Sequence, residues 1–302
     1  MSKSNKIYAA IEAGGTKILC ALMAADGRIL AQTRIATRGP EETLADIDAF
    51  YAAQAEAFGH PRAAGIASFG PIDLDRTSPA YGRLTTTPKQ GWADFDLLGA
   101  IQTMLAVPTA IDTDVNCAAL AEGPAGAAKG LSRYCYMTVG TGIGVGVVEG
   151  GKTSQGTGHP EVGHVRLSRA HGDDFQGICP YHGDCAEGMA SGPAMKARWQ
   201  KSAEDLEIDH PAWEIEAHYI AAICVNLTYS LRPERIIIGG GVLERSTLYN
   251  RIRVHFEELT RGYALDQFSR DAETYIVRPE LVDPSPGLVG ALQLAHAIEH
   301  AE

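Results

Sequence analysis

The stretch "KIYAAIEAGGTKILCALMAADGRILAQTRIA", residues 6 to 36, decides the fold. An apolar run from residue 7 to 11 leads into a Gly-Gly-Thr-Lys loop at residues 14 to 17, and the apolar run ILCALMA follows. Asp26-Gly27 then separates this run from a third apolar segment, and Asp-Gly between two such segments is a strong hairpin signal. The pattern therefore predicts strand, glycine loop, strand, turn and strand in succession.

The same order of elements returns in "YCYMTVGTGIGVGVVEGGKTSQG", residues 134 to 156. A strand-like run meets a Gly-Thr-Gly loop at 140 to 142, a second apolar run follows, and a turn is expected at 149 to 152. The two stretches are offset by about 126 residues, and such a repeated unit predicts two related halves. With helices predicted at 41 to 58, 211 to 231 and the C-terminal end, the sequence indicates an α/β fold in two parts with a cleft between them.

Both glycine-rich loops are candidates for binding phosphate. Neither contains the G-x-x-x-x-G-K-[ST] pattern, and a strand follows each loop where a dinucleotide fingerprint would have a helix. Glycines and threonines at a hairpin tip expose backbone N–H groups and a hydroxyl, which can bind phosphate. One such loop is usually only a turn, whereas two at matching positions favour a phosphate site. A further predicted strand, "RIIIGGGVL" at 235 to 243, ends in glycines where a ligand can approach the backbone closely.

Length and charge limit the class of protein. The 302 residues suffice for two domains, and a formal net charge of -11 disfavours a nucleic-acid partner. No apolar run reaches the ~18 residues of a membrane helix, and the start is broken before a signal-peptide core can form. We therefore expect a cytoplasmic protein without a membrane partner.

Six cysteines are too few for a disulfide framework, and four are expected to be buried thiols: Cys20, Cys117, Cys135 and Cys224.

A cluster of metal-binding residue types occurs in "GICPYHGDCAEG", residues 177 to 188. The three side chains that it supplies, each three residues from the next, are Cys179, His182 and Cys185. A tetrahedral zinc site needs one ligand more, for which His164 is the natural choice and His171 or Asp174 are alternatives. The other interpretation is two free cysteines without a metal. In a cytoplasmic chain the spacing favours structural zinc.

Two other segments could contribute chemistry. In "AIDTDVNCAALAEG", residues 110 to 123, Asp114 is expected where a strand meets a helix, and a carboxylate there can accept a hydroxyl proton. The alternative is a helix cap by Asp114 or Asn116. In "GTGHPEVGHVRL", residues 156 to 167, Glu161 and His164 could hold a hydroxylated ligand. A surface loop with unrelated polar residues is the alternative for this segment, with "HVRL" expected as a strand.

Taken together, these motifs resemble the ROK family of sugar kinases, within the actin-like ATPase superfamily. "EAGGTK" resembles the first phosphate motif, "TDVNCAALAE" the motif with the catalytic Asp, "TVGTGIGVGVVEGG" the second phosphate motif, "PEVGH" the E-x-G-H motif and "IIIGGGV" the adenosine-side motif. The resemblance implies the two-domain actin-like (ribonuclease H-like) fold, each domain a mixed sheet flanked by helices. The expected smaller domain is 1–113 with the helix 288–302, and the larger is 114–287.

Two stretches resemble the bacterial fructokinase branch of this family: "DDFQGICPYHGDCAEG" and "SFGPIDLDRTSPAYGRLTTTPKQGW", residues 68 to 92. The resemblance implies ATP-dependent phosphorylation of fructose to fructose 6-phosphate, with Asp114 as general base, Mg²⁺ at the phosphates and a homodimer. The alternative substrates are glucose, mannose, allose and N-acetylmannosamine. Some ROK proteins are sugar-responsive repressors with an N-terminal helix-turn-helix domain. A first phosphate strand from residue 7 leaves no room for one, so we expect an enzyme.

The resemblance also assigns individual residues. For the sugar it implies Glu161, His164, Glu187, Gly70, Pro71 and Thr113, with the loop at 85 to 89. For the phosphates it implies Gly14, Gly15, Thr16, Lys17, Gly140, Thr141 and Gly142. For the rest of ATP it implies Pro193, Gly239, Gly240, Gly241, Val242 and Leu243. For zinc it implies His164, Cys179, His182 and Cys185. The sequence departs from the family pattern at Glu12, where Asp is usual, and at Thr113, where many ROK glucokinases have an Asn that helps hold glucose.

Overall fold

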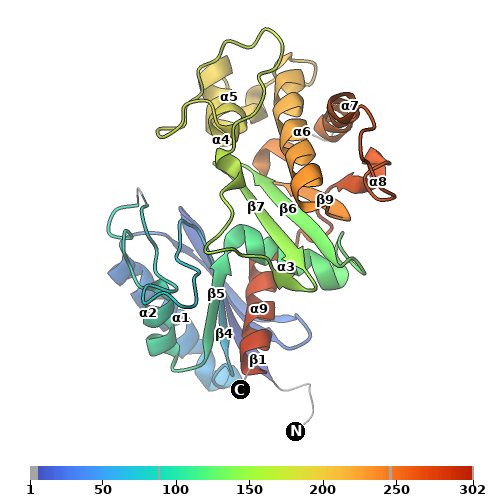
Figure 1. The fold of residues 1–302 in the computed structure, drawn as a ribbon. Helices are drawn as coiled ribbons and strands as arrows, with labels where there is room; N and C mark the ends of the chain where they lie inside the picture. The colour runs from blue at the N-terminus through green and yellow to red at the C-terminus, as the bar shows by residue number, and fades with distance from the viewer. Residues whose placement is uncertain (1–5, 88, 245–246, 301–302) are drawn as a thin grey trace. The chain divides into compact units, whose positions relative to one another are not determined.

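The computed structural model of the chain describes residues 6–87, 89–244 and 247–300. It divides into two compact units (Figure 1). The first comprises Met1–Glu122, Gln155–His159 and Leu281–Glu302, and the second comprises Gly123–Ser154 and Pro160–Glu280. The first unit thus runs past the boundary expected after residue 113. The expected domains remain a prediction, because compactness alone does not test whether each part folds independently.

A five-stranded mixed sheet forms the centre of the first unit, in the order β3-β2-β1-β4-β5. β1 pairs antiparallel with β2 and β2 with β3, whereas the β1–β4 and β4–β5 pairs are parallel. Both predicted hairpins are confirmed, because the first glycine loop joins β1 to β2 and the Asp26-Gly27 turn joins β2 to β3. The strands are β1 (Ile7–Ala13), β2 (Lys17–Ala24), β3 (Ile29–Ala36), β4 (Ala64–Ser68) and β5 (Thr109–Thr113).

The carboxyl ends of three strands lie in one row of this sheet. Ala13 at the end of β1 pairs with Ser68 of β4, and Ser68 pairs with Thr113 of β5. Ligands of α/β proteins bind outside the carboxyl ends of such strands. The register therefore brings three expected site segments to one edge: the first glycine loop, residues 69 to 71, and Asp114.

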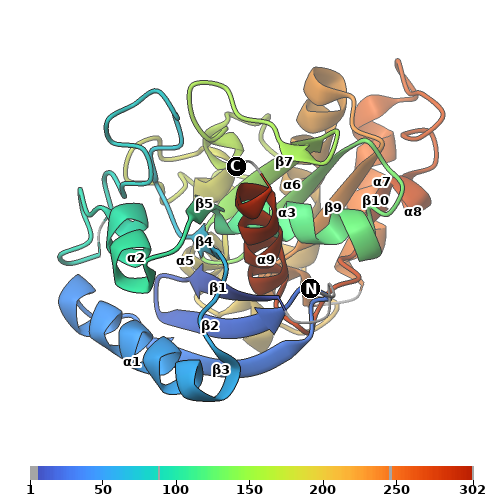
Figure 2. The same ribbon diagram turned by 90° about the horizontal axis from the view of Figure 1, so that it is seen from below.

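Helices cover both faces of the first sheet (Figure 2). On one face Ile47 of α1 and Ile101 of α2 are buried with strand residues such as Ile11. On the other face Leu288 and Ala291 of α9 are buried against a different set of strand residues. The predicted helix at 41 to 58 and the C-terminal helix are confirmed. The helices of this unit are α1 (Pro40–Phe58), α2 (Leu97–Leu105), α3 (Asp114–Ala125), which ends in the second unit, and α9 (Pro286–Glu299).

Two glycines let α9 approach its neighbours closely. A Cβ on Gly65 of β4 would overlap the carbonyl oxygen of Ala291, and a Cβ on Gly290 would overlap the backbone of Cys117 in α3. In each contact the added Cβ would meet backbone atoms, which cannot move aside as a side chain could. Glycine at these two positions therefore fixes the depth at which α9 sits on the sheet and on α3.

The second unit repeats the arrangement of the first. Its sheet has the order β10-β9-β6-β7-β8. β6–β7 and β7–β8 are antiparallel, and β6–β9 and β9–β10 are parallel. The hairpin around the second glycine loop therefore corresponds to the β1–β2 hairpin, and the predicted repeat is confirmed. The strands are β6 (Arg133–Val139), β7 (Ile143–Glu149), β8 (Lys152–Thr153), β9 (Arg235–Gly239) and β10 (Ile276–Val277).

The core of the second unit forms between its sheet and the long helix α6, which runs beside α7 in Figure 1. Trp213 and Ile220 of α6 and Phe256 of α7 are buried in it. The expected helix at 211 to 231 is confirmed. The expected strand "HVRL" is wrong, because His164 ends the short 3₁₀ turn Val162–His164 and Arg166 forms only an isolated bridge with Cys185. The helices are α4 (Ala186–Ala190), α5 (Gly192–Trp199), α6 (Ala212–Leu231), α7 (Leu248–Thr260) and α8 (Ala272–Tyr275), with further 3₁₀ turns Ala203–Asp205 and Gly241–Glu244.

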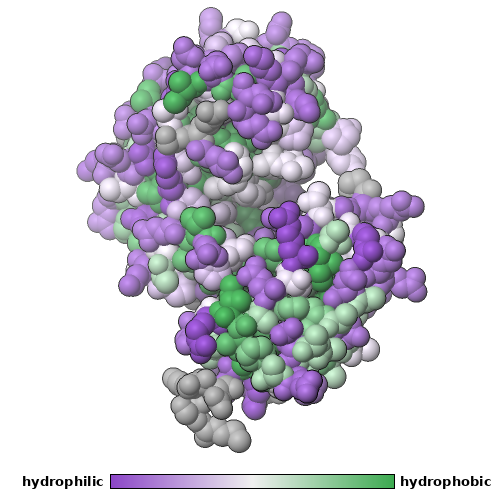
Figure 3. Space-filling view, turned by 180° about the vertical axis from the view of Figure 1, so that it is seen from behind, coloured by the Kyte–Doolittle hydropathy of each residue, from purple (hydrophilic) through white to green (hydrophobic). Residues whose placement is uncertain are grey.

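The surface is largely hydrophilic on the face of the second unit that Figure 3 shows at the top. A few large apolar side chains are nevertheless exposed, among them Tyr181, Tyr263 and Val282. The four cysteines expected to be buried thiols are buried and free. Within the described ranges, no helix has both the length and the apolar character that crossing a membrane requires.

A polar cluster anchors the end of α9 to the first unit. The Tyr8 hydroxyl donates to the carboxylate of Glu299, and Lys6 and Arg62 lie 3.0 Å and 3.3 Å from the same carboxylate. The Tyr8 hydrogen bond and the two cations lower the pKa of Glu299 to about 2. Because the charged form is favoured in the folded chain, this cluster stabilises the fold when Glu299 is ionised.

We expect Glu299→Gln to lower the free energy of unfolding by roughly 1 to 2 kcal/mol at pH 7. The folded pKa lies below the ordinary value near 4.5, so the Glu299 contribution is present above that value and is lost as the pH falls toward about 2. Urea unfolding between pH 7 and pH 3 measures it, with Glu56→Gln on the exposed side of α1 as control. A difference between the two variants that does not shrink on acidification would contradict this role.

Candidate functional site

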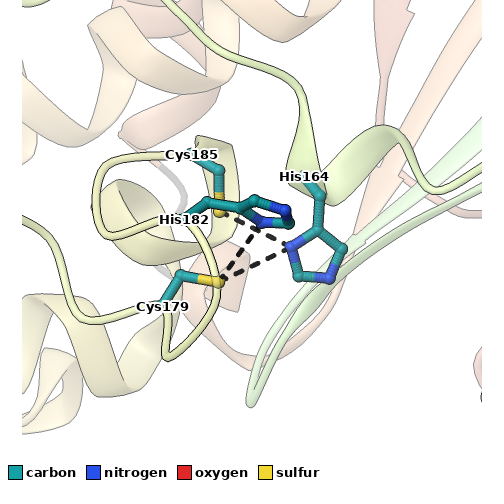
Figure 4. A group of neighbouring side chains, drawn as sticks. All are labelled: His164, Cys179, His182 and Cys185. Atoms are coloured by element: carbon teal, nitrogen blue, oxygen red, sulfur yellow. Dashed lines mark hydrogen bonds between the residues drawn. The ribbon is translucent and has the colours of Figure 1, made fainter.

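Four side chains of the second unit converge on one point (Figure 4). His164 comes from the 3₁₀ turn, Cys179 and His182 come from the following loop, and Cys185 immediately precedes α4. One ligand atom from each lies within 4.8 Å of all the others. Cys179 and Cys185 are buried, while His182 is exposed. The structure thus brings together the four expected residues and leaves out the alternatives His171 and Asp174.

The distances between these atoms fit a tetrahedral metal ion. The Nδ1 atom of His164 lies 3.8 Å from Sγ of Cys179 and 3.5 Å from Sγ of Cys185, and Nδ1 of His182 lies 3.6 Å from Sγ of Cys179. Zinc bonds of 2.0 to 2.3 Å at tetrahedral angles separate sulfur and nitrogen by about 3.6 Å. The donor set, two thiols and two imidazoles, is also one that zinc prefers.

The loop that carries the cluster is held by contacts of its own. Backbone bonds in both directions between Cys179 and Gly183 close a tight turn. The Asp184 carboxylate pairs with Arg166 and Arg169, which follow the His164 turn in sequence. These contacts hold the two ligand-bearing segments together from the outside. The cluster is therefore placed by the local fold as well as by any bound ion.

A buried ion pair holds the start of the same loop. The Arg198 guanidinium of α5 lies 3.1 Å from the Asp173 carboxylate, and both side chains are less than a tenth exposed. The Tyr219 hydroxyl of α6 also donates to Asp173, and Arg198 stacks over Phe175. A buried pair with an added hydrogen bond is costly to break by removing one partner. The loop is thus fixed at its first turn, independently of the Cys/His cluster.

Asp114 is the first residue of α3, directly after β5, as expected. The first turn of α3 is capped by Thr113, whose hydroxyl accepts the Asn116 N–H at 3.1 Å, and Asp114 shares part of the capping role that was its alternative. One oxygen of the Asp114 carboxylate accepts the Val115 N–H at 2.7 Å. Solvent reaches Asp114 although its neighbours are buried. A substrate hydroxyl could therefore reach this carboxylate.

The surroundings of Asp114 suit a proton acceptor. Protein atoms around the carboxylate desolvate it and raise its pKa to about 6, the Val115 N–H opposes this rise, and the negative charge of Glu12 adds to it. Glu12 itself accepts a hydrogen bond from Ser285 at the start of α9. A side chain at Gly287 would overlap the Glu12 carboxylate. The longer acid at position 12 is thus accommodated at a helix N-terminus, where negative charge is favoured.

Two other acids expected at the sugar lie in the second unit. The Glu187 carboxylate accepts the Ile143 N–H at 3.0 Å, so it supports the end of the second glycine loop. Glu161 is exposed immediately before the His164 turn, and partial desolvation raises the pKa of its carboxyl group. His164 belongs to the Cys/His cluster. Sugar binding by these three residues remains a prediction.

Each glycine loop is closed by one backbone hydrogen bond. The Gly14 N–H donates to the Lys17 carbonyl at 2.9 Å, and the Gly140 N–H donates to the Gly142 carbonyl at 2.9 Å. The expected members Gly15, Thr16 and Thr141 lie at the tips of these turns. Residues 69 to 71 follow β4, with a cis bond before Pro71. In the loop at 85 to 89, Pro88 lies outside the described residues.

A pocket of about 780 Å³ opens beside the second glycine loop, within the second unit. It is lined by five of the residues expected at ATP, namely Gly140, Thr141, Pro193, Gly241 and Val242. Of the other expected residues in this stretch, Gly239 and Leu243 are buried. A volume of this size accommodates a nucleotide-sized ligand.

The pocket also has lining residues that the sequence did not predict. These are Gly192, Lys196, Ser202, Ala203, Glu204 and Glu244. Gly192 and Lys196 come from α5, and Ser202 directly precedes the turn that holds Ala203 and Glu204. Glu244 ends the Gly241–Glu244 turn, one residue after the expected stretch 239 to 243. Periodicity places Lys196 on an exposed helix face but cannot show that this face borders a pocket. Only the packing of α5 beside the second glycine loop reveals it.

The repeated mixed sheets define an α/β fold of two similar units, and comparison with known proteins gives its family. The ROK family model matches residues 8–298, so the chain belongs to the ROK family. It is 42% identical to the fructokinase of Pediococcus pentosaceus, over 96% of this chain and 98% of that protein. It is also 42% identical to the fructokinase of Zymomonas mobilis, over 99% and 100%.

Among solved structures, the crystal structure of the ROK hexokinase from Thermus thermophilus superposes with a TM-score of 0.80. The alignment covers 98% of this chain and all of that one at 24% identity. At this identity the likeness shows the fold alone. It confirms the expected actin-like architecture of two mixed sheets flanked by helices.

We expect Cys179→Ser to reduce the bound metal and to lower the melting temperature, because a metal site that joins two segments contributes to folding. Elemental analysis of the purified protein and thermal unfolding, with and without chelator, measure both effects. Cys135→Ala, which removes a buried thiol elsewhere in the unit, is the control for loss of a cysteine. A Cys179→Ser protein with its full metal content would contradict the assignment.

Proposed function

We infer that the chain is a fructokinase, which transfers the γ-phosphoryl group of ATP to fructose and forms fructose 6-phosphate. The observation that carries this inference is the 38 to 42% identity to several fructokinases over nearly the whole chain. The site supports it, because an accessible carboxylate and the first glycine loop lie at one edge of the first sheet, and the second glycine loop borders a nucleotide-sized pocket within the second unit. Glucose and the other hexoses remain alternative substrates.

Asp114 is proposed as the general base. Its carboxylate would accept the proton of the sugar O6 hydroxyl while that oxygen forms a bond to the γ-phosphorus. The bond between the γ-phosphorus and the bridging oxygen breaks, and ADP leaves with the electron pair. A pKa of about 6 keeps most of the carboxylate ionised at neutral pH and makes it a better proton acceptor than an ordinary Asp.

The glycine loops are proposed to hold the phosphates, and the pocket is proposed to hold the rest of ATP. Backbone N–H groups at residues 14 to 16 and 140 to 142 would bind phosphate oxygens, and Lys17 would add positive charge. Charge on the phosphates would further be neutralised by Mg²⁺. Pro193 and Val242 in the pocket lining would border the adenosine.

The sugar contacts are proposed from the same comparison. Glu161, Glu187, Gly70 and Pro71 would bind hydroxyl groups of the hexose. Thr113 uses its hydroxyl to cap α3 and has no amide to offer a sugar. Because many ROK glucokinases have Asn at this position, the threonine supports a preference for a sugar other than glucose.

The Cys/His cluster is proposed as a structural zinc site with all four positions filled by protein. Zinc would join the turn that follows Glu161 to the loop that precedes Glu187. Its contribution would be to hold these two acids in a fixed relation, and no step of phosphoryl transfer requires it. A cytoplasmic location, expected from the sequence, and a homodimer, implied by the family resemblance, remain predictions.

Substrate preference follows from this proposal. In a coupled assay of ADP release we expect kcat/KM for fructose to exceed that for glucose, mannose, allose and N-acetylmannosamine by at least about tenfold. The reason is that hydroxyls of the wrong hexose would leave buried polar groups of the site unpaired. Turnover of another hexose with a higher kcat/KM than fructose would reassign the substrate, and no turnover of any hexose would reject the kinase.

Asp114→Asn should lower kcat by about 10² to 10⁴-fold while fructose and ATP still bind. The substitution should leave the melting temperature equal or higher, because it removes a desolvated charge. In the wild type, kcat/KM should fall below about pH 6, where Asp114 becomes protonated. Asp26→Asn in the β2–β3 turn is the control. Near-normal turnover by Asp114→Asn would exclude it as the base.

A further inference from the structure

A second acid, Asp112, lies two residues before the proposed base and is buried in β5. Its Oδ1 atom accepts the Thr113 N–H at 2.8 Å and the side-chain amide of Asn116 at 2.6 Å. Asn116 is also the residue whose N–H the Thr113 hydroxyl caps. One oxygen of Asp112 therefore fixes the first turn of α3, on which Asp114 stands.

The Asp112 carboxylate also bonds a residue that is distant in the sequence. The side-chain amide of Gln155 donates to both carboxylate oxygens of Asp112, each at 3.1 Å. Gln155 begins the short segment Gln155–His159, which belongs to the first unit although β8 before it and Pro160 after it belong to the second. A carboxylate that is only 3% exposed thus receives this amide in an environment where unpaired groups are costly.

We propose that Asp112 is a positioning residue with two contacts. Its bond to Gln155 fixes the start of the segment that leads to Glu161, and its bond to Asn116 fixes the turn that carries the base. The proposal rests on the function proposed above. From Gln155 the chain runs to Glu161 and His164 without any described strand or helix before the 3₁₀ turn. The hydrogen bond of Gln155 therefore fixes the position of the start of this stretch. Without that bond, Glu161 could adopt a wider range of positions.

Loss of this anchor should affect sugar binding more than the chemical step. Glu161 would have to be ordered when the sugar binds, and that entropic cost raises KM. Asp114 would keep its cap through Thr113, so kcat should change little. A role in general stability alone would instead lower the melting temperature and leave the sugar KM of the folded enzyme unchanged.

The geometry allows an exchange of donor and acceptor between the two side chains. In Asp112→Asn, Oδ1 can keep its bonds to Thr113 and Asn116 while the new amide nitrogen takes the place of Oδ2. In Gln155→Glu, the new carboxylate can accept from that nitrogen. The double variant therefore restores the pair with its polarity reversed and keeps the net charge of the chain. By contrast, Asp112→Asn alone places two amide donors opposite each other, and Gln155→Glu alone places two carboxylate acceptors opposite each other.

Gln155→Glu should raise the KM for fructose by about tenfold or more with kcat within about threefold of wild type, because two carboxylates would face each other. Asp112→Asn should have a smaller effect, since the Gln155 amide can rotate to offer its oxygen. The double variant should return to within about threefold of the wild-type KM. Gln155→Met removes the bond without adding charge and should also raise KM. Gln102→Glu, exposed on α2, is the control for the charge change.

Amide hydrogen exchange of residues 155 to 164 gives a reading that does not depend on activity. Exchange should be faster in Gln155→Glu and Gln155→Met and should return toward wild type in the double variant. A wild-type KM in both single variants at Gln155, or a double variant no better than Gln155→Glu, would overturn the proposal. If the wild type turns over a hexose other than fructose, the proposed substrate fails, and the same comparison made with that hexose still tests the anchor.

Discussion

Both units depend on a central strand that pairs antiparallel on one side and parallel on the other. β1 and β6 each turn back through a glycine loop into the next strand, while a distant strand joins the opposite edge. A hairpin needs only a short turn, but parallel strands need a long crossover. The tight turn and the end of the parallel strand consequently lie side by side, so glycine backbone and functional side chains meet at one edge of each sheet.

The proposed site gathers negative charge in the first unit. Burial raises the pKa of the Cys117 thiol, and the nearby charges of Asp112, Asp114 and Glu12 raise it further. Asp112 is satisfied by backbone and amide donors, and Glu12 by Ser285 at the start of α9. Asp114 has the raised pKa of about 6. Asp112 and Glu12 are thus held by neutral donors, whereas Asp114 is the exposed acid of the three.

Much of this could be predicted from the sequence because the signals are local. The Asp26-Gly27 turn, the two glycine loops and the Cys-x2-His-x2-Cys spacing each depend on neighbouring residues. The ligand His164, 15 residues before Cys179, was the natural choice and is the one the structure brings to the cluster. The fold followed from the repeat of the hairpin.

The features that could not be predicted depend on contacts distant in sequence. Lys196 borders the pocket only because α5 packs beside the second glycine loop. Gln155 meets Asp112 across 43 positions of the chain. The Thr113 cap is local, and the spacing of Thr113 and Asn116 is enough to predict it. The segment "HVRL" alternates polar and apolar residues as a strand does, yet Arg166 forms only an isolated bridge, with Cys185, so the local pattern does not ensure a strand partner.

A crystal structure with fructose and a non-hydrolysable ATP analogue tests the central claim most directly. The account predicts the fructose O6 atom within hydrogen-bond distance of the Asp114 carboxylate, about 2.6 to 3.2 Å, with the adenosine in the pocket between Pro193 and Val242. A bound sugar whose O6 atom faces another residue, with Asp114 distant from every hydroxyl, would contradict it.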